Sequence, residues 1–478
     1  MASDTKSIVW FRQDLRLQDN PALEVAASVG EVLPIYIFDE KNAADWCLGR
    51  ASQWWLNESL RSLNESMNGA LCLYRGDPLR IIEKLITEHS ISNIFWNRCY
   101  EPWQVLRDKT IKSEVRKFGA KARSFNGFLL NEPWEIAKSD GTPYKVFTPF
   151  YKQSRLKGTP REASIDYVSK IRFVSNSKKN REIDSLNLLS ENVWSTEMAS
   201  RWTPGEKGGE QVLKLFLERG LCNYKIGRDF PDKEAVSRLS PYLHFGELSP
   251  NYVWHKVNNF AVLENIETQA EHFHRELVWR EFSYSLLHYF PDLTYRNLNR
   301  RFDDFPWKKN DQFIKKWRTG MTGYPLIDAG MRELASTGYM HNRVRMITAS
   351  FLVKNLLIDW RNGAEWFWDS LVDADLANNS CSWQWVAGSG ADAAPYFRIF
   401  NPVTQSKKFD PDAKYIRRWI TELEKCPNKY IHDPSSAPES ELQHFGIKLD
   451  QTYPSAIVDL KTSREAALRA YQSLKGRS

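Results

Sequence analysis

The chain has 478 residues, of which 42% are hydrophobic and 26% charged, a composition typical of a soluble globular protein with two or three domains. No apolar run reaches the roughly 18 residues of a membrane-spanning helix, and the N-terminus lacks the basic and apolar regions of a signal peptide. We therefore expect a cytoplasmic protein without membrane contact, associated with the nucleoid if bacterial. The net charge of +7 weakly favours a polyanionic partner.

The six cysteines form no C-x-x-C pair, and the nine histidines show no H-E-x-x-H spacing. These patterns favour a reducing compartment and argue against both a disulfide framework and a zinc site. The 19 tryptophans deviate more sharply, since so many indoles serve either packing or stacking on a flat ligand. We expect a monomer that binds no metal.

The first part of the chain is predicted to alternate strands with helices. Apolar runs of strand length occur at Ser7–Phe11, Val32–Phe38, Leu71–Tyr74 and Asn93–Trp96, with helical patterns such as Ala51–Met67 and Pro78–His89 between them. This alternation indicates a parallel sheet with helices on its faces. No G-x-G-x-x-G follows the first strand, so the dinucleotide fingerprint of a Rossmann domain is missing.

The periodicity then fades and later becomes helical. Polar stretches such as Ser175–Ser185 suggest a surface connector that contains short helices or wraps another domain. From Gly205 onward, segments such as "QAEHFHRELVWREFSYSLLHYF" carry apolar residues at a spacing of three to four. We predict an α/β domain with a Rossmann-like parallel sheet at 1–128, a connector at 129–204 and a larger all-α domain at 205–478.

Polar and aromatic residues recur in tight clusters within the helical part. The segment Ser237–Ser240 lies near an expected helix start, where serines and an arginine suit a phosphate, or simply a helix cap with a surface arginine. Glu276, Trp279 and Arg280 share one helix face, either as a binding surface or as an ion pair packed on an indole. The segment His341–Arg345 could read base or phosphate edges, or form a polar helix N-terminus.

A fourth cluster spans residues 373–402. Asp373 and Asp375 could accept hydrogen bonds from a heterocycle or a ribose, and two tryptophans, Trp383 and Trp385, follow them. The stretch "GSGADA" matches G-x-G-x-x-A, but no strand precedes it, so a nicotinamide oxidoreductase has little support. Its glycines are better explained by a backbone passing close to a bulky group. Together the four clusters hold more polar groups than the core of a helix bundle tolerates.

These motifs resemble the photolyase and cryptochrome family, in the same order and over essentially the whole chain. They are "WFRQDLRLQDNPAL", "SRLSPYLHFGELSP", "ELVWREF", "TGYPLIDAGMREL", "GYMHNRVRMITASFLVKNLLIDWRNG" and "DADLANNSCSWQWVAGSGADAAPYFRIFNP". The similarity is greatest to class I-type cyclobutane pyrimidine dimer photolyases. It implies an N-terminal antenna domain and a helical C-terminal domain that holds FAD in a U-shape.

The resemblance implies a set of FAD contacts, with the reduced anionic flavin as the active form. The set is Tyr224, Val236, Ser237, Arg238, Leu239, Ser240, Phe273, Arg280, Asn342, Arg345, Asp373, Asp375 and Asn379. Many relatives have threonine where this chain has Val236, which puts one phosphate contact in question. Asn379 would face flavin N5, where repair enzymes carry asparagine and plant cryptochromes aspartate. A neutral amide can bond a reduced flavin without placing a negative charge beside an anion.

The resemblance also implies a site for damaged DNA. Its expected members are Arg228, Glu276, Trp279, Asn342, Arg343, Met346, Trp385 and Arg398, with Lys407 and Lys408 on a basic rim. Trp279 and Trp385 would wall a hole that receives a flipped-out pyrimidine dimer. Glu276 would bond the dimer carbonyls as a proton or hydrogen-bond donor. The sequence "MHNR" is similar to that of the cyclobutane-dimer class. The (6-4) enzymes carry a second histidine nearby, which this chain lacks.

The implied activity is light-driven repair of pyrimidine dimers in UV-damaged DNA. An electron would pass from excited reduced FAD to the dimer, the cyclobutane ring would split, and the electron would return. Trp383, Trp360 and Trp307 would form a separate relay that reduces the flavin again under light. The alternative is a cryptochrome-type blue-light photoreceptor on the same fold, against which stand Asn379 and Trp385. An antenna pigment, a folate or a deazaflavin, is expected near 97–108 but stays unassigned.

Overall fold

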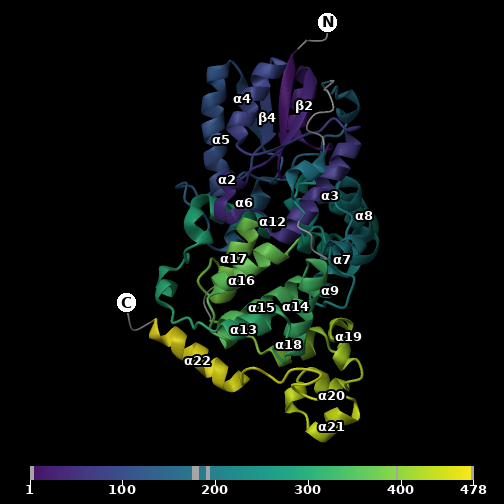
Figure 1. Cartoon of the computed structure of the whole chain (residues 1–478), viewed down its shortest axis with the longest axis vertical. Helices are drawn as coiled ribbons and strands as arrows, with labels where there is room; N and C mark the ends of the chain where they lie inside the picture. The colour runs from purple at the N-terminus through teal and green to yellow at the C-terminus, as the bar shows by residue number, and fades with distance from the viewer. Residues whose placement is uncertain (1–4, 175–181, 190–193, 394–396, 475–478) are drawn as a thin grey trace.

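The computed structural model describes residues 5–174, 182–189, 194–393 and 397–474 (Figure 1). Residues 175–181 of the polar stretch in the expected connector lie outside this description. A sheet lies at one end of the molecule and helices make up the rest, which confirms the predicted fold class. In the described part of the chain, no helix combines the length and the apolarity needed to cross a bilayer.

The sheet contains the four predicted strands and one more. Its strands are β1 Lys6–Phe11, β2 Glu31–Phe38, β3 Cys72–Arg75, β4 Asn93–Asn97 and β5 Lys121–Phe125. All neighbours pair in parallel, in the order β3-β2-β1-β4-β5. The sequence pattern missed β5 because its sequence, KARSF, carries two basic residues and lies partly exposed at the edge of the sheet.

Residues of β1 alternate between two hydrophobic cores. Val9 and Phe11 belong to the larger core, which also holds residues of α1 and α3. Ile8 and Trp10 belong to a smaller core with residues of α4 and α5. Because helices cover both faces of the sheet, the central strands are continuous apolar runs rather than alternating ones.

Helices form the remainder of the structure. Those around the sheet are α1 Pro21–Val29, α2 Glu40–Ala43, α3 Arg50–Ser66, α4 Pro78–His89 and α5 Pro102–Glu114, and those in the expected connector are α6 Phe147–Leu156 and α7 Trp194–Arg201. They are followed by α8 Glu206–Leu215, α9 Tyr224–Gly227, α10 Ser240–His244, α11 Pro250–Glu264, α12 Glu267–Tyr289, α13 Asp311–Arg318, α14 Pro325–Thr337, α15 Asn342–Ser350 and α16 Trp360–Ser370. The last are α17 Leu376–Ala387, α18 Pro402–Phe409, α19 Lys414–Trp419, α20 Asn428–Ile431, α21 Glu439–His444 and α22 Leu460–Ser473.

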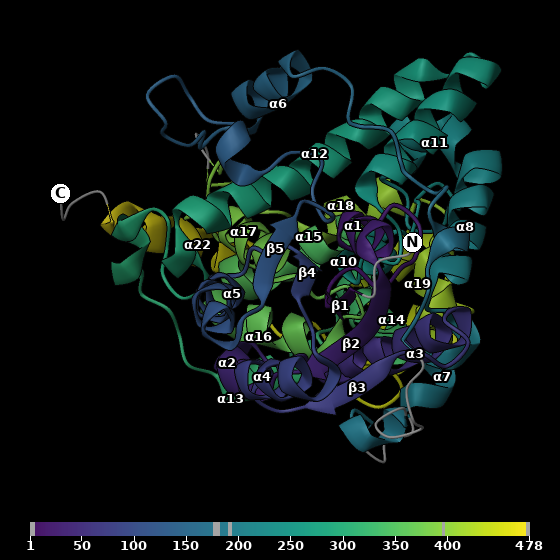
Figure 2. The same ribbon diagram turned by 90° about the horizontal axis from the view of Figure 1, so that it is seen from above.

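Helix α12 is the long element around which the site is built. It has 23 residues and contacts α6, α9, α11 and α17. Figure 2 shows α12 running diagonally past the sheet, with α6 along its outer side. Buried residues occur on every side of its middle turns, so α12 is a central helix rather than a surface one.

The loop that follows β1 joins the sheet to the helical part. Arg16 is only 1% exposed, and its guanidinium donates to the carbonyl oxygens of Asp19 (2.7 Å), Gly127 (2.6 Å) and Gly246 (2.8 Å). The Glu206 carboxylate, at the start of α8, accepts the backbone N–H groups of Leu17 and Gln18, each at 3.0 Å. The sequence motif around "DLRLQDN" therefore holds the two halves of the molecule together.

We expect Arg16→Lys to destabilise the fold by about 2–3 kcal/mol. A lysine ammonium cannot reach carbonyl groups on three separate segments, so at least one buried carbonyl loses its charged donor. Urea unfolding followed by circular dichroism measures the change, with Arg123→Lys on the exposed side of β5 as the matched control. Equal unfolding midpoints for the two variants would contradict this role of Arg16.

Candidate functional site

Asp375 lies where three helices of the helical part meet. It is the N-cap of α17, and its Oδ1 accepts the backbone N–H of Asn378 at 2.8 Å. Its Oδ2 contacts Nδ1 of His244 at 3.3 Å and accepts the Tyr284 hydroxyl. Burial alone would raise the pKa of Asp375, but the hydrogen bond and charge of His244 outweigh it and lower that pKa. A buried carboxylate thus fixes α17 against α10 and α12.

Asp373 is the second buried carboxylate and it faces α10 and α15. Its Oδ2 accepts Nη2 of Arg345 at 2.9 Å and the hydroxyl of Ser240 at 2.6 Å. Its Oδ1 is buried and has no hydrogen-bond partner among the described residues. An unpaired carboxylate oxygen at this depth calls for a donor from a ligand or from water.

The predicted phosphate segment forms the turn before α10. Arg238 adopts a left-handed backbone conformation with φ of 52°, and Ser237 Oγ accepts the backbone N–H of Leu239 at 3.4 Å. Leu239 is buried, whereas Arg238 is exposed and Val236 and Ser237 are half-buried. The turn carries the Ser237 hydroxyl and the Arg238 guanidinium. It leads directly into Ser240, whose hydroxyl donates to Asp373.

The other predicted cofactor residues divide into two groups. Tyr224 and Phe273 are buried and pack against each other with ring centroids 5.5 Å apart. Arg280 instead donates to the carbonyl oxygens of Phe128 (3.0 Å) and Leu243 (3.4 Å). The guanidinium of Arg280 therefore links α12 to the segment after β5 and to α10.

Asn379 and Asn342 lie in the first turns of two different helices, α17 and α15. The Asn379 amide donates through Nδ2 to the carbonyl of Ala364 on α16 at 3.0 Å, and its oxygen has no donor among the described residues. Asn342 is the first residue of α15 and is exposed. His341 caps that helix, and burial beside Arg343 and Arg345 lowers the pKa of His341 to about 3.

Glu276 and Arg228, both predicted for the lesion site, form an ion pair. Trp279, on the same face of α12, is half-buried, and one face of its ring is covered by Phe147. Arg343 is paired in turn with Asp229 at 2.6 Å. Local sequence patterns could not predict either ion pair. The first joins α12, and the second joins α15, to the segment that follows α9.

The remaining predicted DNA contacts lie on α15, α17 and α18 and on the loop between α17 and α18. Trp385 and Met346 are half-buried, and Arg343 Nη1 lies 3.8 Å from the Met346 sulfur. Arg398, Lys407 and Lys408 are exposed. Residues 394–396 of the same sequence motif lie outside the described part of the chain.

The predicted tryptophan relay lies within or against one hydrophobic core. Trp383 and Trp360 are both buried there, and the half-buried Trp307 packs against it. Trp383, however, has its edge-to-face contact with Trp317 of α13, at 6.2 Å between centroids. Trp360 donates Nε1 to Asn297 at 3.0 Å. The sequence did not single out Trp317, because one indole on an amphipathic helix looks like an ordinary core residue.

The "GSGADA" stretch follows α17 rather than a strand. Gly388 ends α17 in a left-handed conformation with φ of 95°. A Cβ on Gly390 would lie 2.8 Å from the backbone nitrogen of Trp385. These glycines let the chain fold back on the backbone at the end of the helix, and they are not a dinucleotide fingerprint.

Comparison with known proteins places this arrangement in a family. Residues 7–165 match the family described as DNA photolyase, and residues 273–473 match the FAD binding domain of DNA photolyase. The deoxyribodipyrimidine photo-lyase of Agrobacterium fabrum is 46% identical over 473 residues, which cover 98% of each chain. Cryptochrome-1 of Arabidopsis thaliana is 36% identical over 98% of this chain and 70% of its own length. The chain belongs to the photolyase and cryptochrome family.

A solved structure of the same family matches the whole molecule. It is the crystal structure of a bacterial class III photolyase from Agrobacterium tumefaciens, with a TM-score of 0.94, 45% identity, and coverage of 100% of this chain and 99% of that chain. The motifs had indicated the greatest similarity to class I-type enzymes, whereas this relative is of class III. The family prediction itself is confirmed.

FAD is the cofactor of this photolyase-family chain, and the residues present fit it. The free Oδ1 of Asp373 can accept a ligand hydroxyl or N–H, and the buried Nε2 of His244 also has no partner among the described residues. Ser237 and Arg238 offer a hydroxyl and a cation for phosphates. The residues present thus supply both charged and neutral partners for a flavin nucleotide.

The segment expected near an antenna pigment lies at the carboxyl ends of β1 and β4, where the strand order reverses. Open α/β sheets commonly bind ligands at such a point. In this photolyase-family member, Arg12 and Arg107 both lie over the Trp10 ring, at 4.9 and 4.6 Å, and both bond Asp108. These side chains pair with one another, and the pigment stays unassigned.

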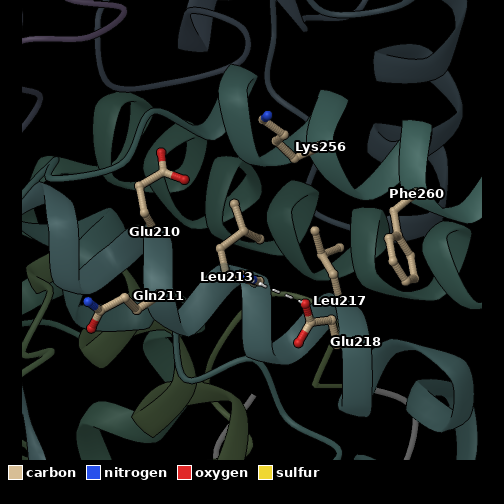
Figure 3. Close-up of a pocket in the computed structure, with 8 residues that line it drawn as sticks. Glu210, Gln211, Leu213, Leu217, Glu218, Lys256 and Phe260 are labelled. Carbon is tan, nitrogen blue, oxygen red and sulfur yellow. Dashed lines mark ion pairs between the residues drawn. The ribbon is translucent and has the colours of Figure 1, made fainter.

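A separate hollow of about 380 Å³ lies between α8 and α11 (Figure 3). Its lining residues are Glu210, Gln211, Leu213, Lys214, Leu217, Glu218, Lys256 and Phe260. None of them belongs to the predicted cofactor or DNA contacts. Lys214 and Glu218 pair at its rim, 3.9 Å apart.

Glu101, the N-cap residue of α5, should make stability depend on pH. It is 3% exposed, and its carboxylate accepts the Trp103 indole N–H at 2.7 Å. Burial, reinforced by the charge of Asp375, raises the pKa of Glu101 from 4.5 to about 7. The unfolded chain therefore releases this proton at lower pH than the folded one, and the resulting stability is lost as pH rises through 7.

Because Glu101 loses its proton, we expect the unfolding free energy of the wild type to fall by about 3 kcal/mol between pH 4.5 and pH 8. Glu101→Gln has no proton to release and should lack that fall. Urea midpoints at several pH values measure the difference, with the exposed Glu88→Gln as control. An identical pH profile in Glu101→Gln and the wild type would refute the assignment.

Proposed function

We propose that this chain splits cyclobutane pyrimidine dimers in UV-damaged DNA, driven by light. One observation carries the proposal: Trp279 places a half-exposed indole beside the Glu276–Arg228 pair on one face of α12. A flat apolar surface next to hydrogen-bonding groups suits a pyrimidine dimer turned out of the DNA duplex. The photo-lyase relatives support the same conclusion.

Reduced FAD, when bound, supplies the light-excited electron that splits the cyclobutane ring and is recovered afterwards. The protein positions the lesion and keeps it out of water. In this proposal Trp279 and Trp385 stack on the two bases, and each stacked base contributes roughly 1–3 kcal/mol. Asn342 and Arg343 orient the lesion from the start of α15. Trp383, Trp360 and Trp307 carry electrons from the surface, with Trp317 as a further neighbour.

Asn379 separates this proposal from a cryptochrome. Its Nδ2 is engaged by Ala364, so the side-chain oxygen is left to accept a hydrogen bond from the cofactor. An amide has no proton to give at neutral pH and carries no charge, so it suits a cofactor that stays anionic. A carboxylate in the same place would repel the anion or protonate it.

The Glu276–Arg228 pair refines the role that the motifs suggested for Glu276. A carboxylate bound to a guanidinium accepts hydrogen bonds and does not donate them. Glu276 can therefore donate to a dimer carbonyl only after Arg228 has moved to another anion and the freed carboxylate has taken up a proton from solvent. We propose that a DNA phosphate is that anion, so binding of the strand frees Glu276.

The exposed Arg398, Lys407 and Lys408 provide the phosphate contacts of the rim in this proposal. Affinity for DNA then falls as salt rises, because each neutralised phosphate releases counterions. A blue-light photoreceptor is the second candidate, supported by 36% identity to a plant cryptochrome. The amide at Asn379 argues against it.

Repair of a defined lesion decides between the two candidates. The FAD-loaded protein is reduced, mixed with UV-damaged oligo(dT) and irradiated, and the thymine absorbance is followed over time. We expect recovery of the absorbance in the light and none in the dark. No recovery with demonstrably reduced flavin would exclude the repair function and favour the photoreceptor.

We expect Glu276→Ala to lower the repair yield per photon about fivefold, the effect of one lost hydrogen bond of about 1 kcal/mol. Glu276→Gln, which keeps a donor, should lie between Ala and the wild type. Lesion binding should survive in part, and Glu267→Ala, exposed on the first turn of α12, serves as the control. An unchanged yield in Glu276→Ala would remove its assigned role.

A further inference from the structure

Phe147, the first residue of α6, lies flat against Trp279. The two ring centroids are 3.7 Å apart, the planes differ by 7°, and Phe147 is only 1% exposed. One face of the indole is therefore fully covered by a phenyl ring. Trp279 as a whole is still half-buried, so its remaining surface is the part that a ligand can reach.

Phe147 is itself held from other sides. Phe282 contacts its ring edge-to-face at 5.9 Å, and Tyr151 lies 5.7 Å away in a stacked arrangement. The Arg275 guanidinium lies 5.5 Å from the ring centroid. A ring packed this closely has no free rotamer, so it acts as a fixed backing for the indole.

The same segment reaches the loop that follows Trp385. The backbone N–H of Asp392 donates to the carbonyl of Lys145 at 3.2 Å, which brings the Asp392 carboxylate close to the backbone N–H of Phe147. That loop is also tied to its helix, since the N–H of Gly390 donates to the Gln384 carbonyl at 2.9 Å. Residues 145–147 thus contact the Trp279 indole directly and, through Asp392, reach the loop that follows Trp385.

The geometry points to Phe147 and Asp392 as positioning residues that fix the spacing and orientation of the two lesion-stacking indoles. The inference rests on the proposed function, because it takes Trp279 and Trp385 as the walls of the lesion site. Neither residue touches the lesion. They act by ordering the indoles before DNA arrives, so that binding does not have to immobilise them.

If Phe147 served only to pack the core, its loss would affect lesion binding no more than the loss of another ring in the same core. Phe150 provides that comparison. Phe150 lies on the same helix, is 2% exposed and contacts Phe282 at 5.2 Å. Its ring lies against Phe282, whereas that of Phe147 lies against Trp279. Phe147→Leu and Phe150→Leu remove rings of equal size from one core, but only the first frees an indole face.

The test measures dissociation constants in the dark for FAD-loaded protein with dimer-containing and undamaged oligonucleotides, then the repair yield at saturating lesion. We expect Phe147→Leu to weaken binding of damaged DNA about tenfold, as one stacked base loses its preset partner. Affinity for undamaged DNA and the yield at saturation should change less than twofold. Phe147→Tyr, which keeps the ring, should bind like the wild type.

Asp392→Asn provides a second variant that leaves the phenyl ring in place. It should weaken lesion binding by a smaller factor, about threefold, because the negative charge that Asp392 places near the Phe147 backbone N–H is removed. Equal lesion affinities for Phe147→Leu and Phe150→Leu would overturn the proposal. If wild-type protein binds damaged and undamaged DNA equally, the proposed function fails first and this inference with it.

Discussion

The helical part depends on two buried carboxylates at the start of α17. Asp375 caps that helix and holds His244 of α10 and Tyr284 of α12. Asp373 holds Arg345 of α15 and Ser240 of α10. An isolated carboxylate at this depth costs several kcal/mol, and partners from helices distant in sequence offset that cost. Since α17 also carries Asn379 and Trp385, the same contacts that hold the fold set the geometry of the site.

The local sequence pattern was enough to predict the elements whose apolar runs or capping residues lie within or next to the element itself. The buried strands β1, β2 and β4 are continuous apolar runs, and α4 was bounded correctly because Asp77 caps it and a proline begins it. The edge strand β5 was missed because exposure removes the apolar signal. The same local reading identified the residues of α17 as chemically unusual, since polar and aromatic residues there follow no helical period.

Contacts between distant segments could not be predicted, and several of them decide what the site residues do. No spacing rule brings Phe147 to Trp279 or Arg228 to Glu276, because loops and other helices separate each pair. The family resemblance named Glu276 and Trp279, but only the coordinates show what each one touches. The resemblance named Arg280 as a cofactor contact. Its guanidinium donates to the carbonyl oxygens of Phe128 and Leu243 and so ties α12 to the segment after β5 and to α10.

Two buried polar atoms of the helical part, Asp373 Oδ1 and His341 Nε2, lack hydrogen-bond partners among the described residues. Asp373 Oδ1 is an acceptor without a donor among the described residues. His341 is neutral, because burial lowers its pKa to about 3, and its Nδ1 accepts the Arg343 N–H at 3.2 Å. Its proton must then lie on Nε2, a buried donor that also has no partner in the described structure. Each such group costs about 1–3 kcal/mol when unsatisfied. A cofactor that donates a hydrogen bond to Asp373 Oδ1 therefore stabilises this fold as well as equipping it, and cofactor loading and folding stability are linked.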